Sequence, residues 1–218
     1  VLGAVLKGGL ERGKWAIFGD FTRQAIYQNA DKVDDMIEEL DSRTSFIRFK
    51  LKINCRNTKF IGDEIKCITG FDSGVYIWSK IEGVPVEHKI FTSQEEQKRQ
   101  LEDLVSKLIA DGISAENITI LSPYKRENSV VAEISNMKIR DYTPKIDGKV
   151  TFSTIQSYKG LENTVIIMTD VESFEHEQLM YVGLSRARSG LFILESNGAR
   201  KEYLDIQRRR FLEDGYKT

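Results

Sequence analysis

The sequence predicts an α/β fold in which a mostly parallel sheet carries helices on both faces. From about residue 94 onward, apolar stretches of strand length alternate with stretches that repeat apolar residues at helical spacing. The strand candidates are apolar along most of their length, as expected of strands that are covered on both sides. With 218 residues, 40% of them hydrophobic and 30% charged, the chain has the size and composition for a buried core.

Three elements are expected in the first 45 residues. They are a short helix, a buried strand and a second helix, at residues 1–10, 15–19 and 31–42. The chain begins with Val1 and not with Met, inside the first helix, so we expect that further sequence precedes it. Residues 1–45 are therefore interpreted as the remnant of a domain whose parent sheet lies upstream.

Residues 46–218 are expected to form one domain. It opens with an extended stretch at 46–53 and a helix at 57–68. Strand-like alternation around Glu82-Gly83 predicts a small hairpin or a pair of strands within 74–91. Helices and strands then alternate. The expected helices occupy residues 94–111, 127–137, 177–188 and 198–212, and the expected strands occupy residues 118–121, 150–154, 164–169 and 191–194.

Composition excludes several kinds of site. A formal net charge of -1 provides no global field for nucleic acid, so any such binding needs a local groove. The two cysteines, Cys55 and Cys67, and the two histidines, His88 and His176, form neither a disulfide framework nor a zinc-binding pattern. No apolar run approaches the roughly 20 residues of a membrane span, and no secretion signal opens the chain. We expect a cytoplasmic protein without a metal site or membrane contact.

Four dense polar clusters lie beside predicted strands, and ligands of open α/β sheets bind beyond the carboxyl ends of the strands. The clusters are GDFTRQAIY at 19–27, LKINCRNT at 51–58, TIQSYKGLE at 154–162 and YVGLSRARSGLFIL at 181–194. Three of them also have a plain structural reading: a solvated turn in the first, a surface arginine at Arg56 in the second, and a helix C-terminus neutralised by Arg186 and Arg188 in the fourth. In the third cluster, Gly160 permits a tight backbone turn.

In order and approximate spacing, the four clusters resemble motifs III, IV, V and VI of the UvrD/Rep/PcrA-like superfamily 1 helicases. The resemblance covers the whole chain in outline and is closest in motifs V and VI. It implies a RecA-like, P-loop NTPase-type fold and a motor in which two such domains clamp ATP and walk along a single strand. Residues 1–45 would then be a remnant of the first motor domain with motif III, and residues 46–218 the second motor domain, with the 74–91 hairpin as an insertion.

The resemblance implies catalytic roles for three residues. Gln24 resembles the glutamine that senses the γ-phosphate, and Arg56 and Arg186 resemble the arginines that reach this phosphate from the second domain. Cations suit that role, because phosphoryl transfer is catalysed mainly by positioning and by stabilisation of the spreading negative charge. The other implied nucleotide-binding residues are Asp20, Gly160 and Glu162.

The resemblance also implies contacts with single-stranded DNA, the expected partner, through Tyr27, Thr154, Gln156 and Lys159. Contacts of this kind to the backbone carry no sequence information. The chain departs from the family pattern in four places. Motif III has one extra residue before Gln24, Cys55 replaces the aromatic residue that stacks on adenine, Gln156 replaces a histidine, and the sequence QNAD after Tyr27 lacks a second stacking aromatic residue.

The cofactors implied are ATP and Mg²⁺. The sequence contains neither the GxxxxGK[ST] loop that cradles phosphates nor the acidic pair that holds magnesium. We expect these elements upstream of Val1, in the other half of the same protein, which is therefore a partner of this chain. The longer protein is expected to be an ATP-dependent DNA helicase, and this chain alone is expected to be inactive.

Two other functions remain open. A helicase-derived module that binds nucleic acid or docks a protein, without hydrolysis, is favoured by the missing stacking aromatic residue. The presence of Arg56, Glu162 and Arg186 argues against it, since only a nucleotide needs them. A different nucleotide enzyme on a doubly wound sheet, such as a nucleotidyltransferase, has the same fold, and fold alone does not separate these functions.

Overall fold

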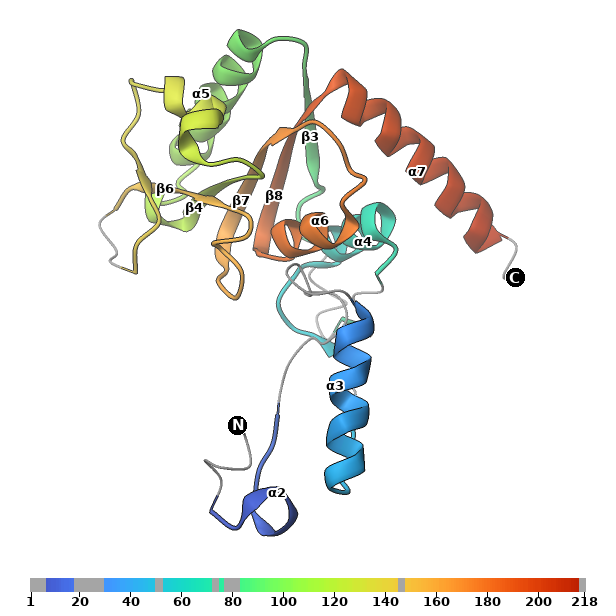
Figure 1. Cartoon of the computed structure of the whole chain (residues 1–218). Helices are drawn as coiled ribbons and strands as arrows, with labels where there is room; N and C mark the ends of the chain where they lie inside the picture. Colours follow the sequence, from blue (N-terminus) through green and yellow to red (C-terminus); the bar gives the residue numbers. More distant parts are fainter. Residues whose placement is uncertain are drawn as a thin grey trace. The chain divides into compact units, whose positions relative to one another are not determined.

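The computed structural model describes residues 7–17, 30–49, 53–71, 75–76, 83–144 and 148–215 (Figure 1). The chain divides into two compact units, Val1–Lys52 and Ile53–Thr218. The boundary therefore lies after residue 52, beyond the boundary predicted after residue 45. One reason is that Phe46 belongs to the first unit, where its ring centroid lies 5.7 Å from that of Trp15.

The first unit contains two described helices, α2 (Gly9–Arg12) and α3 (Ala30–Arg43). Helix α3 agrees with the prediction for 31–42. The helix predicted at 1–10 is found only as the single turn α2, and described residues 14–17 do not form the predicted strand. There, the Trp15 indole donates a hydrogen bond to the Leu10 carbonyl at 2.9 Å, which folds this segment back onto α2.

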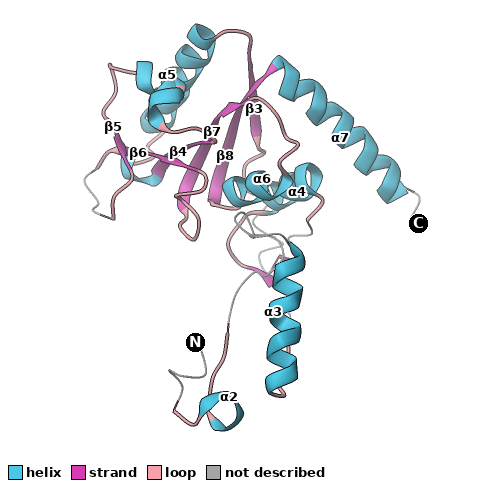
Figure 2. Ribbon diagram, in the orientation of Figure 1, coloured by secondary structure: helices cyan, strands magenta, loops and turns pink. Residues whose placement is uncertain are grey.

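A six-stranded sheet forms the centre of the second unit, and all of its strand pairs are parallel (Figure 2). Its spatial order is β3-β8-β7-β4-β6-β5. The strands are β3 (Glu87–Phe91), β4 (Ile118–Ser122), β5 (Ile139–Asp141), β6 (Val150–Thr154), β7 (Asn163–Val171) and β8 (Ala187–Ser196). Four of the six coincide with strands predicted from apolar runs, so the predicted mostly parallel α/β fold is confirmed.

Helices cover both faces of this sheet. Helix α5 (Gln94–Ala110) packs over one face, and α4 (Lys59–Thr69), α6 (Glu177–Leu184) and α7 (Asn197–Gly215) pack beside the other. Strand β7 contacts helices on both faces, because its side chains alternate between the two faces of the sheet. Val165 and Ile167 lie in the core beneath α5, whereas Met168 lies against Gly183 of α6.

Two strands are described within 74–91, as one of the two alternatives for this segment predicted, but they do not pair with each other as a hairpin. Strand β2 (Val75–Tyr76) pairs in parallel with β1 (Ile53–Asn54), and β3 pairs in parallel with β8. Alternating side chains identify a strand but not its partner.

Two predicted helices are also corrected. In place of a helix at 127–137 there are two 3₁₀ turns, η2 (Arg126–Asn128) and η3 (Val130–Glu133), and a further 3₁₀ turn, η1 (Ala115–Asn117), precedes β4. Ser129 caps η3 with its hydroxyl, which interrupts the helical hydrogen bonds. The helix predicted at 177–188 ends at Leu184, because Ala187 already pairs with Asn163 of β7.

Among the described residues, no helix is both long and apolar enough to cross a membrane. Within the same part of the chain, no group of three or more His, Cys, Asp or Glu side chains is arranged to hold a metal ion.

Candidate functional site

Three of the polar clusters meet at one edge of the sheet. Glu162, directly before β7, places one carboxylate oxygen 2.9 Å from Arg56 Nε and the other 3.8 Å from Arg188 Nε. Arg56 lies between β1 and α4, and Arg188 is the second residue of β8. The side chains of Arg56, Glu162 and Arg188 are 40%, 43% and 59% exposed, so we call this group the exposed charge cluster.

Hydrogen bonds between side chains and the backbone hold together the segments that carry this cluster. The Asn57 side-chain amide donates to the carbonyls of Ser185, at 3.3 Å, and Ala187, at 2.5 Å, which ties the start of α4 to the turn between α6 and β8. Asn54 Oδ1 accepts hydrogen bonds from the backbone N–H groups of Arg56 and Asn57. Sequence reasoning missed the role of Asn57, although asparagines at 54 and 57, between a strand and a helix, are a typical signal of a side-chain-stabilised turn.

Arg186 is fully buried and faces into the protein. Its guanidinium donates to the carbonyls of Val182, at 2.8 Å, and Leu161, at 3.2 Å, and to the Ser185 hydroxyl at 2.8 Å. Burial, followed by the nearby charge of Arg56, lowers the pKa of Arg186 to about 10, so it remains a cation at neutral pH. The side chain therefore ties the C-terminal end of α6 to the loop before β7.

That loop depends on Gly160, whose φ of +88 lies in the left-handed region that favours glycine. The turn brings the Leu161 carbonyl to Arg186 and the Glu162 carboxylate to Arg56. The loop that contains Gly160, Leu161 and Glu162 therefore contacts both arginines.

The residues predicted to contact nucleic acid are divided between two edges. Thr154 ends β6 at the carboxyl edge of the sheet, where its hydroxyl hydrogen-bonds the Ser157 hydroxyl at 2.9 Å. Gln156 is half-buried and Lys159 is exposed on the turns that follow. Tyr158, between them, is buried with its hydroxyl 3.3 Å from Thr119 Oγ1, so the loop already runs towards the amino edge there. The positions of Asp20, Gln24 and Tyr27 lie outside the described residues.

The exposed charge cluster corrects one expectation from the sequence. Ligands were expected beyond the carboxyl ends of the strands, but Glu162 and Arg188 lie at the amino ends of β7 and β8. The long connection between the parallel strands β6 and β7 carries its polar residues from one edge of the sheet to the other.

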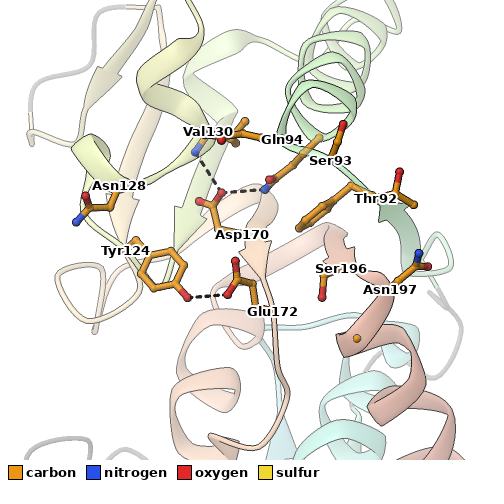
Figure 3. Close-up of a pocket in the computed structure, with 13 residues that line it drawn as sticks. Thr92, Ser93, Gln94, Tyr124, Asn128, Val130, Asp170, Glu172, Ser196 and Asn197 are labelled. Atoms are coloured by element: carbon orange, nitrogen blue, oxygen red, sulfur yellow. Dashed lines mark hydrogen bonds between the residues drawn. The ribbon is translucent and has the colours of Figure 1, made fainter.

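The carboxyl edge contains a cavity of about 470 Å³ that the sequence did not predict (Figure 3). Its lining comes from the ends of β3, β7 and β8, from the loop after β4, and from the first turns of α5 and α7. Tyr124 and Glu172 lie on one side of it, joined by a hydrogen bond of 3.4 Å. The lining residues include no Lys or Arg, so the cavity is poorly suited to phosphate.

Asp170 anchors the wall of this cavity. Its carboxylate is almost completely buried and accepts four hydrogen bonds, from Gln97 Nε2, Ser122 Oγ, Ser129 Oγ and the Val130 N–H, at 2.6–3.2 Å. Its φ of +57 is a conformation that Asp and Asn tolerate better than most residues. In the sequence, the one signal of this buried carboxylate is a single acidic residue after the apolar run of β7.

The parallel six-stranded sheet with helices on both faces defines a RecA-like α/β domain. Comparison with family models identifies the chain further. The model of the AAA domain family, AAA_12, matches residues 21–197, and the chain belongs to this family.

Two similar proteins are described as helicases. The ATP-dependent helicase NAM7 of Saccharomyces cerevisiae is 27% identical over 101 residues, which cover 43% of this chain and 10% of that protein. The chain thus matches about a tenth of the length of this relative. A solved structure, the C-terminal domain of a possible DNA helicase from Lactobacillus plantarum WCFS1, superimposes with a TM-score of 0.51 at 17% identity, covering 65% of this chain and 86% of that one.

Proposed function

We propose that the chain supplies the second RecA-like motor domain of an ATP-dependent superfamily 1 helicase of the UvrD/Rep/PcrA-like kind. The convergence of Arg56, Glu162 and Arg186 from three distant segments at one edge of the sheet carries this proposal. Membership of the AAA domain family and the similarity to a protein described as an ATP-dependent helicase support it.

The residues present fit a phosphate but not a magnesium ion. Guanidinium groups offer paired N–H donors with the geometry of phosphate oxygens, and Arg56 is exposed enough to use them. By contrast, the described residues include no group of acidic side chains that could hold a metal, and the sequence lacks the GxxxxGK[ST] loop. ATP would thus lie between this edge and an upstream domain that holds Mg²⁺.

In this proposal, each residue of the site has a separate task. Arg56 places a positive charge against the terminal phosphate, where negative charge spreads during transfer. Glu162 pairs with Arg56 through its carboxylate, and Gly160 gives the loop the turn that brings Glu162 there. Arg186 holds the loop against α6 and keeps a cation near Arg56.

Single-stranded DNA is the proposed track, contacted by Thr154, Gln156 and Lys159. For Tyr27 we likewise propose contact with the strand, and for Asp20 and Gln24 contact with the nucleotide. Because the net charge of the chain is -1, such contacts must be local.

Lys159→Glu is expected to weaken the binding of single-stranded DNA by about tenfold and to reduce its salt dependence, since a phosphate contact is lost. Fluorescence anisotropy at several salt concentrations measures both, and equal binding by Lys159→Glu and the wild type would remove Lys159 from the track.

ATP hydrolysis by the longer protein, with and without single-stranded DNA, tests the function itself. We expect hydrolysis that the strand stimulates.

A second candidate function, a non-catalytic module that binds nucleic acid, is favoured by one observation: Arg186 donates its hydrogen bonds to protein acceptors. Binding of the strand without any hydrolysis would support that module and reject the motor.

A further inference from the structure

Arg188 has no part in the function described so far, yet it shares Glu162 with Arg56. The two oxygens of one carboxylate point at two guanidinium groups, at 2.9 and 3.8 Å, from segments far apart in the sequence. All three side chains are about half exposed, so solvent and solutes reach them. Two cations that converge on one small anion form the arrangement by which proteins hold a phosphate.

The backbone holds this arrangement in place. Ala187, next to Arg188, pairs with Asn163, next to Glu162, at the start of β8 and β7. The carbonyl of Ala187 also accepts the hydrogen bond of Asn57, next to Arg56. Arg56, Glu162 and Arg188 are thus each next in sequence to a residue of this hydrogen-bonded junction. The fold therefore fixes the separation of the backbone positions that carry the two arginines.

We propose that Arg56 and Arg188 form a phosphate-binding pair, and that the Glu162 carboxylate is an internal counter-anion which the phosphate displaces. The proposal deepens the proposed function and rests on it, because it assigns the polyphosphate chain of a nucleotide to this edge. Glu162 then acts as a positioning residue that keeps the two cations together and lowers the affinity of the pair for anions.

Arg186 cannot replace Arg188 in this pair as the structure stands. It is fully buried, and its donors are directed at two backbone carbonyls and a hydroxyl. Arg188, by contrast, is the most exposed of the three arginines and is held by one long ion pair. Exposed ion pairs contribute little to stability. A phosphate group with two negative charges therefore competes well with the singly charged Glu162 carboxylate for the arginines.

A different role for Glu162 makes the opposite prediction. If its carboxylate accepts a hydrogen bond from the ligand, then Glu162→Gln weakens binding. If it is a displaceable counter-anion, Glu162→Gln strengthens binding, because the amide no longer pairs with the arginines or repels the phosphate. One isosteric substitution therefore separates the two roles.

The test is a titration of the ¹⁵N-labelled 218-residue chain with sodium triphosphate, followed by NMR of the arginine Nε–H signals. We expect the Arg56 and Arg188 signals to shift and the Arg186 signal to stay in place. Glu162→Gln is expected to lower the dissociation constant roughly three- to tenfold, which corresponds to about 0.7–1.4 kcal/mol in total for the loss of two exposed ion pairs. Arg188→Ala should raise the dissociation constant by a similar factor.

Matched controls are available on exposed positions away from the cluster. Glu133→Gln on η3 changes the net charge exactly as Glu162→Gln does, and Arg209→Ala on α7 matches Arg188→Ala; neither should alter the dissociation constant. Unchanged backbone amide spectra establish that each variant is folded. Weaker binding by Glu162→Gln, or unchanged binding by Arg188→Ala, overturns the proposal.

Failure of this proposal and failure of the proposed function look different. If strand-stimulated hydrolysis is present but Arg188→Ala binds triphosphate as the wild type does, the motor stands and the arginine pair falls. If the pair binds triphosphate as expected but the longer protein never hydrolyses ATP, the pair stands as an anion site and the motor falls.

Discussion

The two edges of the parallel sheet hold their carboxylates in different ways. At the amino edge, Glu162 is 43% exposed and meets two arginines through single, solvent-accessible ion pairs. At the carboxyl edge, Asp170 is 7% exposed and accepts four hydrogen bonds from β4, α5 and η3. Exposed ion pairs contribute up to about 1 kcal/mol, whereas a buried carboxylate that loses its partners costs several times more. Asp170 therefore stabilises the fold, and Glu162 is able to exchange partners.

The largest effect is expected from Asp170→Ala. It leaves the buried donors of Gln97, Ser122 and Ser129 without their acceptor and should reduce the free energy of unfolding by about 3–5 kcal/mol. Urea unfolding measures this. Asp141→Ala is the matched control, because Asp141 is exposed and forms an ion pair with Arg126, so its loss should stay below about 1 kcal/mol. Equal losses in the two variants would break the comparison between the edges.

Arg186→Ala comes next, with an expected loss of about 2–4 kcal/mol. Although it lies beside the exposed charge cluster, Arg186 is buried, and its removal leaves the Leu161 carbonyl without this donor and the Val182 carbonyl with the Ser185 hydroxyl at 3.2 Å. Arg188→Ala, on the same edge, should cost less than about 1 kcal/mol. A similar loss from both arginines would show that position on the edge, and not burial, decides stability.

His88 gives a smaller, pH-dependent effect. Burial disfavours its charged form, but hydrogen bonds to Glu195, at 3.2 Å, and Glu64, at 3.1 Å, outweigh burial and raise the pKa of His88 to about 9. The protonated form is therefore stabilised on folding. Its contribution is complete below pH 6.5 and is lost as the pH rises from there through 9, by about 2–3 kcal/mol in total.

Unfolding of the wild type and of His88→Gln in urea at pH 6 and pH 9.5 measures this contribution. The wild type should lose more stability than His88→Gln between the two pH values, because only the wild type releases the proton. Parallel losses in both proteins would mean that His88 does not hold its charge between the two glutamates.

The sheet could be predicted from the sequence because its central strands have strand patterns of their own. The runs at 118–121 and 164–169 are mostly apolar on both faces, and 150–154 alternates the apolar Val150 and Phe152 with Thr151 and Ser153. The turns at 126–133 could not be predicted. The spacing of Val130, Val131 and Ile134 is helical, but the carboxylate of Asp170 and the hydroxyl of Ser129 bind the backbone there and interrupt a helix.

The candidate site was predictable in membership but not in geometry. Arg56, Gly160, Glu162 and Arg186 were identified from motifs, and the structure brings them together. Whether each arginine faces solvent or protein depends on contacts such as the Leu161 carbonyl, which no spacing reveals. From the sequence, Arg188 was interpreted only as a cation at a helix C-terminus, because the pairing of Ala187 with Asn163, which places it beside Glu162, is visible only in the structure.

The most direct test of the central claim is the rate of ATP hydrolysis by the longer protein at saturating ATP and single-stranded DNA, comparing Arg56→Ala with the wild type. If Arg56 faces the terminal phosphate, kcat falls by roughly 10³-fold or more, while Arg209→Ala, an exposed control on α7, retains the wild-type rate. Hydrolysis that is strand-stimulated and unchanged in Arg56→Ala would contradict the assignment of this edge to the nucleotide.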